Sequence, residues 1–180
     1  MKKLKFFIIL FWMIFSKSYD AYCTFYHTPD LSLEANPLVS VLGFSWFWLL
    51  LVIGILTIYT CYTLYLISFK PIILYPSEKG LSFCDFITYM YFGKKSNMLS
   101  ILYKFPSLKN KRFHYTFGNI FTRYLVFAGI VSTVMWLLIN NSEFYREIHN
   151  HLVIYGILIC GTFIILYHYY KTNFKRYQLS

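Results

Sequence analysis

A long uncharged stretch constrains the fold of this chain more than any other feature. Residues 35–69 are 35 positions without an Asp, Glu, Lys or Arg, bounded by Glu34 and Lys70. About 20 apolar residues suffice to cross the hydrocarbon core of a bilayer. Charged residues make up 13% of the chain, whereas soluble domains carry roughly 25%. The sequence therefore predicts an integral membrane protein.

Hydropathy divides the chain into four predicted spans. They cover about residues 4–26, 38–68, 122–140 and 151–170. The spans are continuously apolar and do not alternate with period two, which favours α-helices over a β-barrel. We expect residues 1–180 to form one all-α membrane domain, a bundle of about four transmembrane helices.

Two of the predicted spans have alternative interpretations. The second is longer than one crossing needs, so either its helix tilts or extends past the bilayer, or its first residues form a separate short element near Gly43. The first also has the outline of a signal peptide cleaved after Ser18. Lys17 and Asp20 close to that point favour a retained helix.

The charges between the spans predict the orientation of the chain. Residues 70–123 contain nine Lys or Arg against two acidic residues, and the segments before the first span and after the fourth are also basic. Residues 27–37 and 140–151 are acidic in balance. By the positive-inside rule, both termini and the basic loop of about residues 70–120 lie in the cytoplasm, here of a bacterial inner membrane.

The basic loop contains a predicted helix of its own. Phe83, Phe86, Ile87, Met90 and Tyr91 recur at helical spacing and precede two lysines. This pattern is typical of a helix in the cytoplasmic interface of the membrane, and the alternative is a helix packed against the bundle. No nucleic-acid-binding motif accompanies the positive charge, so nucleic acid is not an expected partner.

A polar constellation near the outer end of the first two spans is the candidate site. If the first span is helical, Asp20, Thr24 and His27 lie on one face, at i, i+4 and i+7. An ionisable group inside a span costs at least ~2.5 kcal/mol, so it normally faces protein or water. The candidate site residues are Asp20, Thr24, His27, Glu34 and Asn36.

The same residues have a structural interpretation. Asn36 is expected to act as the N-cap of the second span, with Pro37 in the first helical position. Glu34 would interact favourably with the dipole of that helix. Asp20 would hydrogen-bond to Asn36 or to nearby backbone amides, and so fix how the first two helices meet.

A functional interpretation adds residues from the other acidic connection. Asp20, His27, Asp30 and Glu34, joined by His149 and His151, could bind a divalent cation or act as acids and bases on a lipid-linked substrate. Their spacing matches no metal signature, and the four cysteines form no CxxC pair. We therefore predict no metal, cofactor or catalytic residue.

The constellation resembles a motif of small bacterial multi-span membrane proteins. The resemblance covers about residues 19–60, roughly a third of the chain. It implies a site at the matching positions and carries no activity with it. Those positions are Asp20, Thr24, Glu34, Asn36 and Pro37.

Three functions remain open. The favoured one is a non-catalytic membrane component that binds the bilayer and a lipid or protein partner, a second copy of the chain included. The alternative is an enzyme acting on a lipid or envelope precursor through the outer Asp/His/Glu cluster. A transporter or channel is disfavoured because spans two to four carry almost no deep charged residues.

Overall fold

The structure, a computed structural model, describes residues 2–32, 34, 36–107 and 109–179. Its regular secondary structure is helical, and these ranges contain no strand. Four helices of the described chain are long and apolar enough to cross a membrane. They are α1 (Lys2–His27), α3 (Trp46–Phe69), α6 (Lys111–Asn141) and α8 (His151–Gln178). The predicted fold class, an all-α membrane bundle with four spans, is confirmed.

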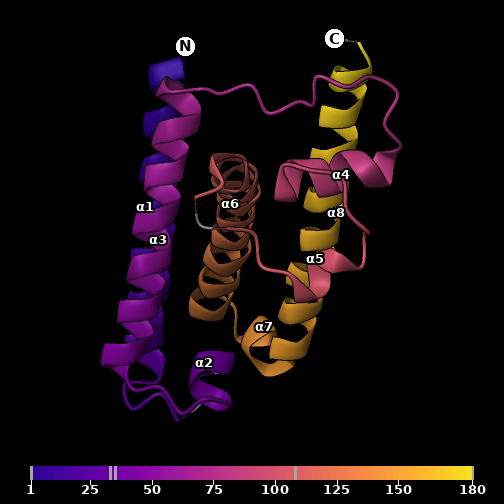
Figure 1. Ribbon diagram of the computed structural model, residues 1–180. Helices are drawn as coiled ribbons and strands as arrows, with labels where there is room; N and C mark the ends of the chain where they lie inside the picture. The colour runs from indigo at the N-terminus through magenta and orange to yellow at the C-terminus, as the bar shows by residue number, and fades with distance from the viewer. Residues whose placement is uncertain (1, 33, 35, 108, 180) are drawn as a thin grey trace.

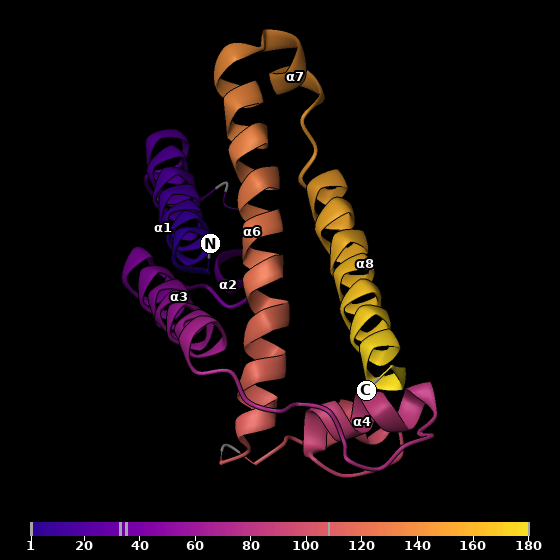
Figure 2. The same cartoon turned by 90° about the horizontal axis from the view of Figure 1, so that it is seen from above.

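Helix α6 lies at the centre of the bundle and contacts the other three long helices. Helices α1 and α3 contact each other and lie on one flank of α6, while α8 lies on the other flank (Figures 1 and 2). Helix α6 therefore lies between two walls. One wall is formed by α1 and α3, and the other is formed by α8.

Glycines on α6 let α1 and α3 approach closely. A Cβ added at Gly118 would lie 2.4 Å from Thr63 of α3. One added at Gly129 would lie 2.4 Å from the Ser16 hydroxyl oxygen of α1. Both distances are shorter than van der Waals contact, so these two helices pack on α6 where it has no side chain, as small residues commonly allow between membrane helices.

The second long helix begins later than predicted. Residues 38–45 belong to the short helix α2 (Pro37–Ser40) and a turn with Gly43 at φ +65°, and α3 starts at Trp46. The expectation of one span over 38–68 is wrong at its beginning, and the alternative of a separate short element near Gly43 is confirmed. A residue at positive φ ends the first element, because the chain must turn there before α3 begins.

Helices α6 and α8 are longer than the apolar segments that predicted them. Helix α6 begins at Lys111, 11 residues before the predicted start of the span at position 122. Asn110 caps this helix, because its side chain accepts a hydrogen bond from the Arg112 amide (3.1 Å). Helix α8 continues past residue 170 to Gln178. Hydropathy detects the part of a helix that lies in lipid and misses the turns that continue beyond it.

The predicted helix of the basic loop exists as α4 (Phe83–Phe92). Ser82 caps its first turn, and Gly93 ends it at φ +77°. Phe86 and Met90 are fully buried against the ends of α6 and α8. Helix α4 therefore packs against the bundle, which was the second of the two alternatives.

Different elements lie at the two ends of the bundle. Both termini and α4 lie at one end, and α2 and the short helix α7 (Glu143–Ile148) lie at the other (Figure 1). A further short helix, α5 (Ser100–Tyr103), follows α4 in the basic loop. Helix α1 continues past Ser18 and packs on α3 and α6, as expected for a retained span; its retention stays a prediction.

Candidate functional site

A cleft of about 910 Å³ lies over α6, between the wall of α1 and α3 and the wall of α8. Its walls are mainly aliphatic, with Leu49 and Ile53 from α3 and Ile154 and Leu158 from α8. This volume is at the upper end of the range of about 300–1,000 Å³ typical of small-molecule sites. The cleft is thus large enough to hold a ligand the size of a lipid segment.

The cleft opens sideways, toward the surroundings of the bundle. Three of its lining residues are largely exposed: Ile14 (50%), Leu50 (49%) and Ile58 (71%). All three lie within helices that could span the membrane. Exposed apolar side chains on helices that cross a bilayer face the lipid tails, so this side of the cleft suits an apolar ligand.

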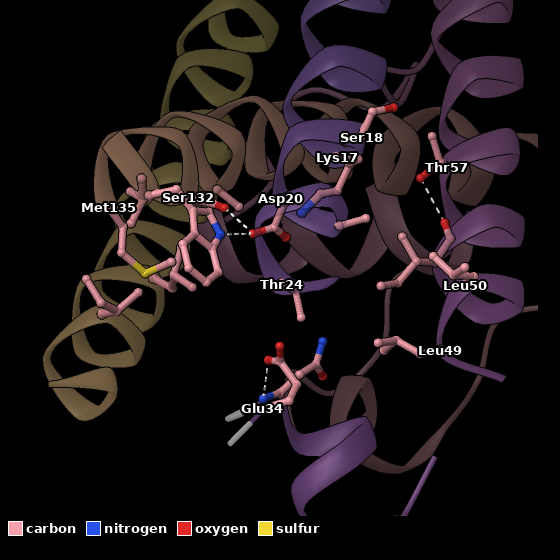
Figure 3. A pocket seen from close by; sticks show the side chains of 18 of the residues that line it. Lys17, Ser18, Asp20, Thr24, Glu34, Leu49, Leu50, Thr57, Ser132 and Met135 are labelled. Carbon is pink, nitrogen blue, oxygen red and sulfur yellow. Dashed lines mark hydrogen bonds between the residues drawn. The ribbon is translucent and has the colours of Figure 1, made fainter. Parts of the chain in front are cut away.

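Asp20 joins α1 to α6. Its Oδ1 accepts hydrogen bonds from the Ser132 hydroxyl (2.5 Å) and from the Trp136 indole N–H (2.8 Å), as Figure 3 shows. The expectation that Asp20 bonds Asn36 or nearby backbone amides is wrong. Hydrogen bonds to a carboxylate are about twice as strong as neutral ones, and α6 supplies two donors one turn apart.

The predicted face of α1 divides between the cleft and α6. Asp20 and the buried Thr24 line the cleft. The His27 ring stacks on Trp136, with ring centroids 5.3 Å apart, and lies 2.8 Å from the Asn140 side-chain oxygen. His27 is therefore not among the lining residues and belongs to the contact between α1 and α6.

Glu34 and Asn36 each accept a hydrogen bond from a backbone amide at one end of the cleft. Asn36 Oδ1 accepts from the Leu38 amide (3.1 Å), and Glu34 Oε1 accepts from the Asn36 amide (2.9 Å). Asn36 thus acts as the predicted N-cap, with Pro37 in the first helical position, but the helix that it caps is the short α2 and not α3. Glu34 and Asn36 both line the cleft.

Two buried polar atoms lie at the same end of the cleft. Thr28 is 7% exposed, and its hydroxyl has no hydrogen-bond partner within the described chain. The same holds for Nδ1 of His149. Burial, with a smaller contribution from His151, holds the pKa of His149 below its usual value of 6.5, so its ring is neutral at pH 7.

The predicted acidic and histidine cluster is assembled only in part. His149 and His151 line the cleft with Asp20 and Glu34, whereas Asp30 lies outside it. The Asp30 carboxylate accepts from the amide and hydroxyl of Ser32, and these bonds lower its pKa. Among the residues the structure describes, no three His, Cys, Asp or Glu side chains are placed to hold a metal ion.

Sequence reasoning missed several residues of the cleft. Lys17 lines it, about one helical turn from Asp20, and makes no ion pair within the described ranges, where Lys95–Glu78 is the single salt bridge. The sequence did contain a signal, which was a lysine inside an apolar run. That lysine was interpreted only as an argument against a cleaved signal peptide. Ser132 and Trp136, four residues apart in an apolar segment, were a second signal of a polar face on the third span.

Comparisons with protein-family models, curated proteins and solved structures found no match to this chain. The resemblance of residues 19–60 to a motif of small bacterial membrane proteins stays a prediction. The chemistry of the cleft is therefore the basis on which a function can be proposed.

Proposed function

We propose that this protein is a non-catalytic component of a bacterial inner membrane that binds a lipid in the cleft. The observation that carries this proposal is the combination of an apolar rim open to the bilayer with a polar end made by Glu34, Asn36 and Thr28. Binding sites with mostly apolar walls and a few convergent polar groups suit amphipathic ligands.

The shape of a lipid corresponds to the arrangement of the cleft. Acyl chains would lie between α3 and α8, in contact with Leu50, Ile53 and Leu158. The headgroup would lie at the end formed by α2 and the start of α8, where polar side chains gather. Such a ligand buries apolar surface without leaving its charged part in hydrocarbon.

The proposed orientation has both termini in the cytoplasm. It is supported by the location of the two termini and the basic α4 region at one end of the bundle (Figure 1). Lysines and arginines flanking spans are retained on the cytoplasmic side. The polar end of the cleft would then belong to the outer leaflet of the inner membrane.

A membrane enzyme acting on a lipid precursor is the second candidate. It is favoured by the neutral His149 in the same cleft as Asp20 and Glu34, because a neutral imidazole can act as a general base. Incubation of the protein in lipid vesicles distinguishes the two candidates. A binding protein leaves the lipid chemically unchanged, whereas an enzyme produces a modified lipid.

Two glycines provide a matched test of lipid binding. A side chain at Gly54, which lines the cleft, meets nothing within 4 Å, and the same is true of Gly156, which does not line it. We expect Gly54→Trp to fill the cleft and Gly156→Trp to leave it open. Lipid retained by the detergent-purified protein, counted by native mass spectrometry, should be lost in Gly54→Trp alone. Equal retention in both variants, or none in the wild type, would contradict the proposal.

A further inference from the structure

Resting on that proposed function, we infer that the bound lipid is a zwitterionic aminophospholipid. Its ammonium group faces Glu34 and Asp20, its phosphate faces Lys17, and its acyl chains lie along α3 and α8. The inference depends on the order of charges along the cleft, on acceptor oxygens that the protein leaves unused, and on two buried polar atoms.

The charges follow one another along the cleft in the order of such a headgroup. Glu34 lies at the α2 end, and Asp20 and Lys17 lie farther from it on α1 (Figure 3). Three residues of α-helix rise about 4.5 Å, which places Lys17 deeper than Asp20. In an ethanolamine phospholipid the ammonium is outermost, the phosphate lies beneath it, and the chains follow. Carboxylates, then a lysine, then aliphatic side chains complement that sequence.

Each carboxylate has one oxygen that the described chain leaves without a hydrogen bond. Asp20 receives both of its bonds on Oδ1, and Glu34 receives its bond on Oε1. The remaining oxygens can accept from an ammonium group, which has three donors. Lys17 lies inside a helix that could span the membrane and makes no ion pair among the described residues. An intramembrane charge is expected to have a partner of opposite sign, and a phosphate supplies one.

Thr28 and His149 add an independent indication of a ligand. The Thr28 hydroxyl and His149 Nδ1 are buried at the headgroup end and have no partner within the described chain. Buried polar atoms are nearly always hydrogen-bonded in folded proteins. A headgroup with both donors and acceptors can satisfy both atoms, whereas an apolar ligand can satisfy neither.

The same groups discriminate against other headgroups. With His149 neutral, two carboxylates oppose one lysine, so the polar end carries a net negative formal charge. Phosphatidylglycerol carries a net negative charge and is repelled there. A choline phospholipid has the right charges, but its methylated nitrogen has no N–H to donate to Glu34 or Asp20.

The test measures which lipid the full-length protein retains. The protein is reconstituted with equal amounts of phosphatidylethanolamine, phosphatidylcholine and phosphatidylglycerol of the same chains, re-extracted in mild detergent, and its retained lipid is identified by mass spectrometry. We expect about a tenfold or greater enrichment of phosphatidylethanolamine over phosphatidylcholine, as one hydrogen bond to a charged group implies. Enrichment of phosphatidylglycerol, or no preference, would overturn the inference.

Two variants distinguish the headgroup assignment from the proposed lipid-binding function. Glu34→Gln keeps an oxygen to accept from the Asn36 amide, so the turn is preserved, and we expect the enrichment to fall toward one. Glu147→Gln, an exposed carboxylate outside the cleft, should leave the enrichment intact. A retained lipid of bulk composition would overturn the headgroup assignment alone. Absence of any retained lipid would overturn the proposed function as well.

Discussion

At the scale of single residues, Asp20 has a structural role, as its position in the sequence predicted, but its partners lie on α6 and were not predicted. Its carboxylate binds a hydroxyl and an indole N–H from α6, 112 and 116 positions away in the chain. Without Asp20, both donors would remain within the contact between α1 and α6. A buried donor that loses its acceptor costs the free energy of its desolvation.

We expect Asp20→Ala to destabilise the protein by about 2 kcal/mol, because the Ser132 hydroxyl and the Trp136 indole lose their shared acceptor. The thermal unfolding midpoint of the protein in detergent, and its abundance in the membrane, should both fall. Asp30→Ala is the control, since the Asp30 carboxylate bonds Ser32 in an exposed loop. Equal midpoints for the two variants would show that Asp20 does not link the helices.

His149 is expected to titrate below its usual range. Burial contributes more to its lowered pKa than His151 does, so His151→Gln should raise the His149 pKa without restoring it to 6.5. Since the folded state resists protonation, the stability contributed by His149 is present above pH 6.5 and is lost as the pH falls through its lowered pKa. An NMR titration of the histidine ring in micelles would measure both effects. An unshifted pKa in the wild type would contradict the partial burial of this ring.

At the scale of elements, the sequence predicted where helices exist better than where they begin. The apolar runs located all four spans, because continuous hydropathy is a property of the sequence alone. It did not show that residues 38–45 leave the second span, since α2 and its turn are as apolar as α3. A turn in an apolar segment has no hydropathy signal, and Gly43 was the remaining indication.

The candidate site was predicted in part for a related reason. Asp20, Thr24, Glu34 and Asn36 were identified because they are polar groups near apolar runs, and they line one cleft. The α6 partners of Asp20 could not be inferred, because the register of α1 against α6 depends on packing at Gly129. Contacts between distant segments leave no periodic pattern in the chain.

The close contact at Gly129 predicts a sharp size limit. Gly129→Leu would force a side chain into the Ser16 hydroxyl of α1, and we expect a loss of about 2 kcal/mol or more from overpacking. Gly156→Leu on α8 is the matched control, because nothing lies within 4 Å of its added Cβ. Thermal unfolding of both variants in detergent would compare them. If Gly156→Leu proved the more destabilising, the packing of α1 on α6 would be contradicted.

At the scale of the whole molecule, the number of long helices, the distribution of charge and the position of the cleft are consistent with one orientation in the membrane. An even number of crossings brings both termini to one side, and Figure 1 shows them at one end with α4. The acidic connections that carry Glu34 and Glu147 belong to the other end. The cleft lies between the walls, and its polar end, with Glu34 and His149, is at that second end, which the proposed orientation assigns to the outer leaflet.

The proposed orientation makes a prediction for labelling in intact cells. A cysteine placed at Ser107, in the basic loop, should be protected from a membrane-impermeant maleimide. A cysteine at Glu147, in α7, should react, because this exposed position lies on the proposed outer side. Labelling after lysis should reach both. Reaction at position 107 alone in intact cells would reverse the orientation and leave the fold unchanged.

The most direct measurement is an experimental structure of the full-length protein in a nanodisc that contains phosphatidylethanolamine. We predict elongated density for a lipid over α6, between α3 and α8, with its headgroup at Glu34 and its chains beside Ile53 and Leu158. A structure in which α8 closes against α3 and leaves no room for a lipid would contradict the central claim.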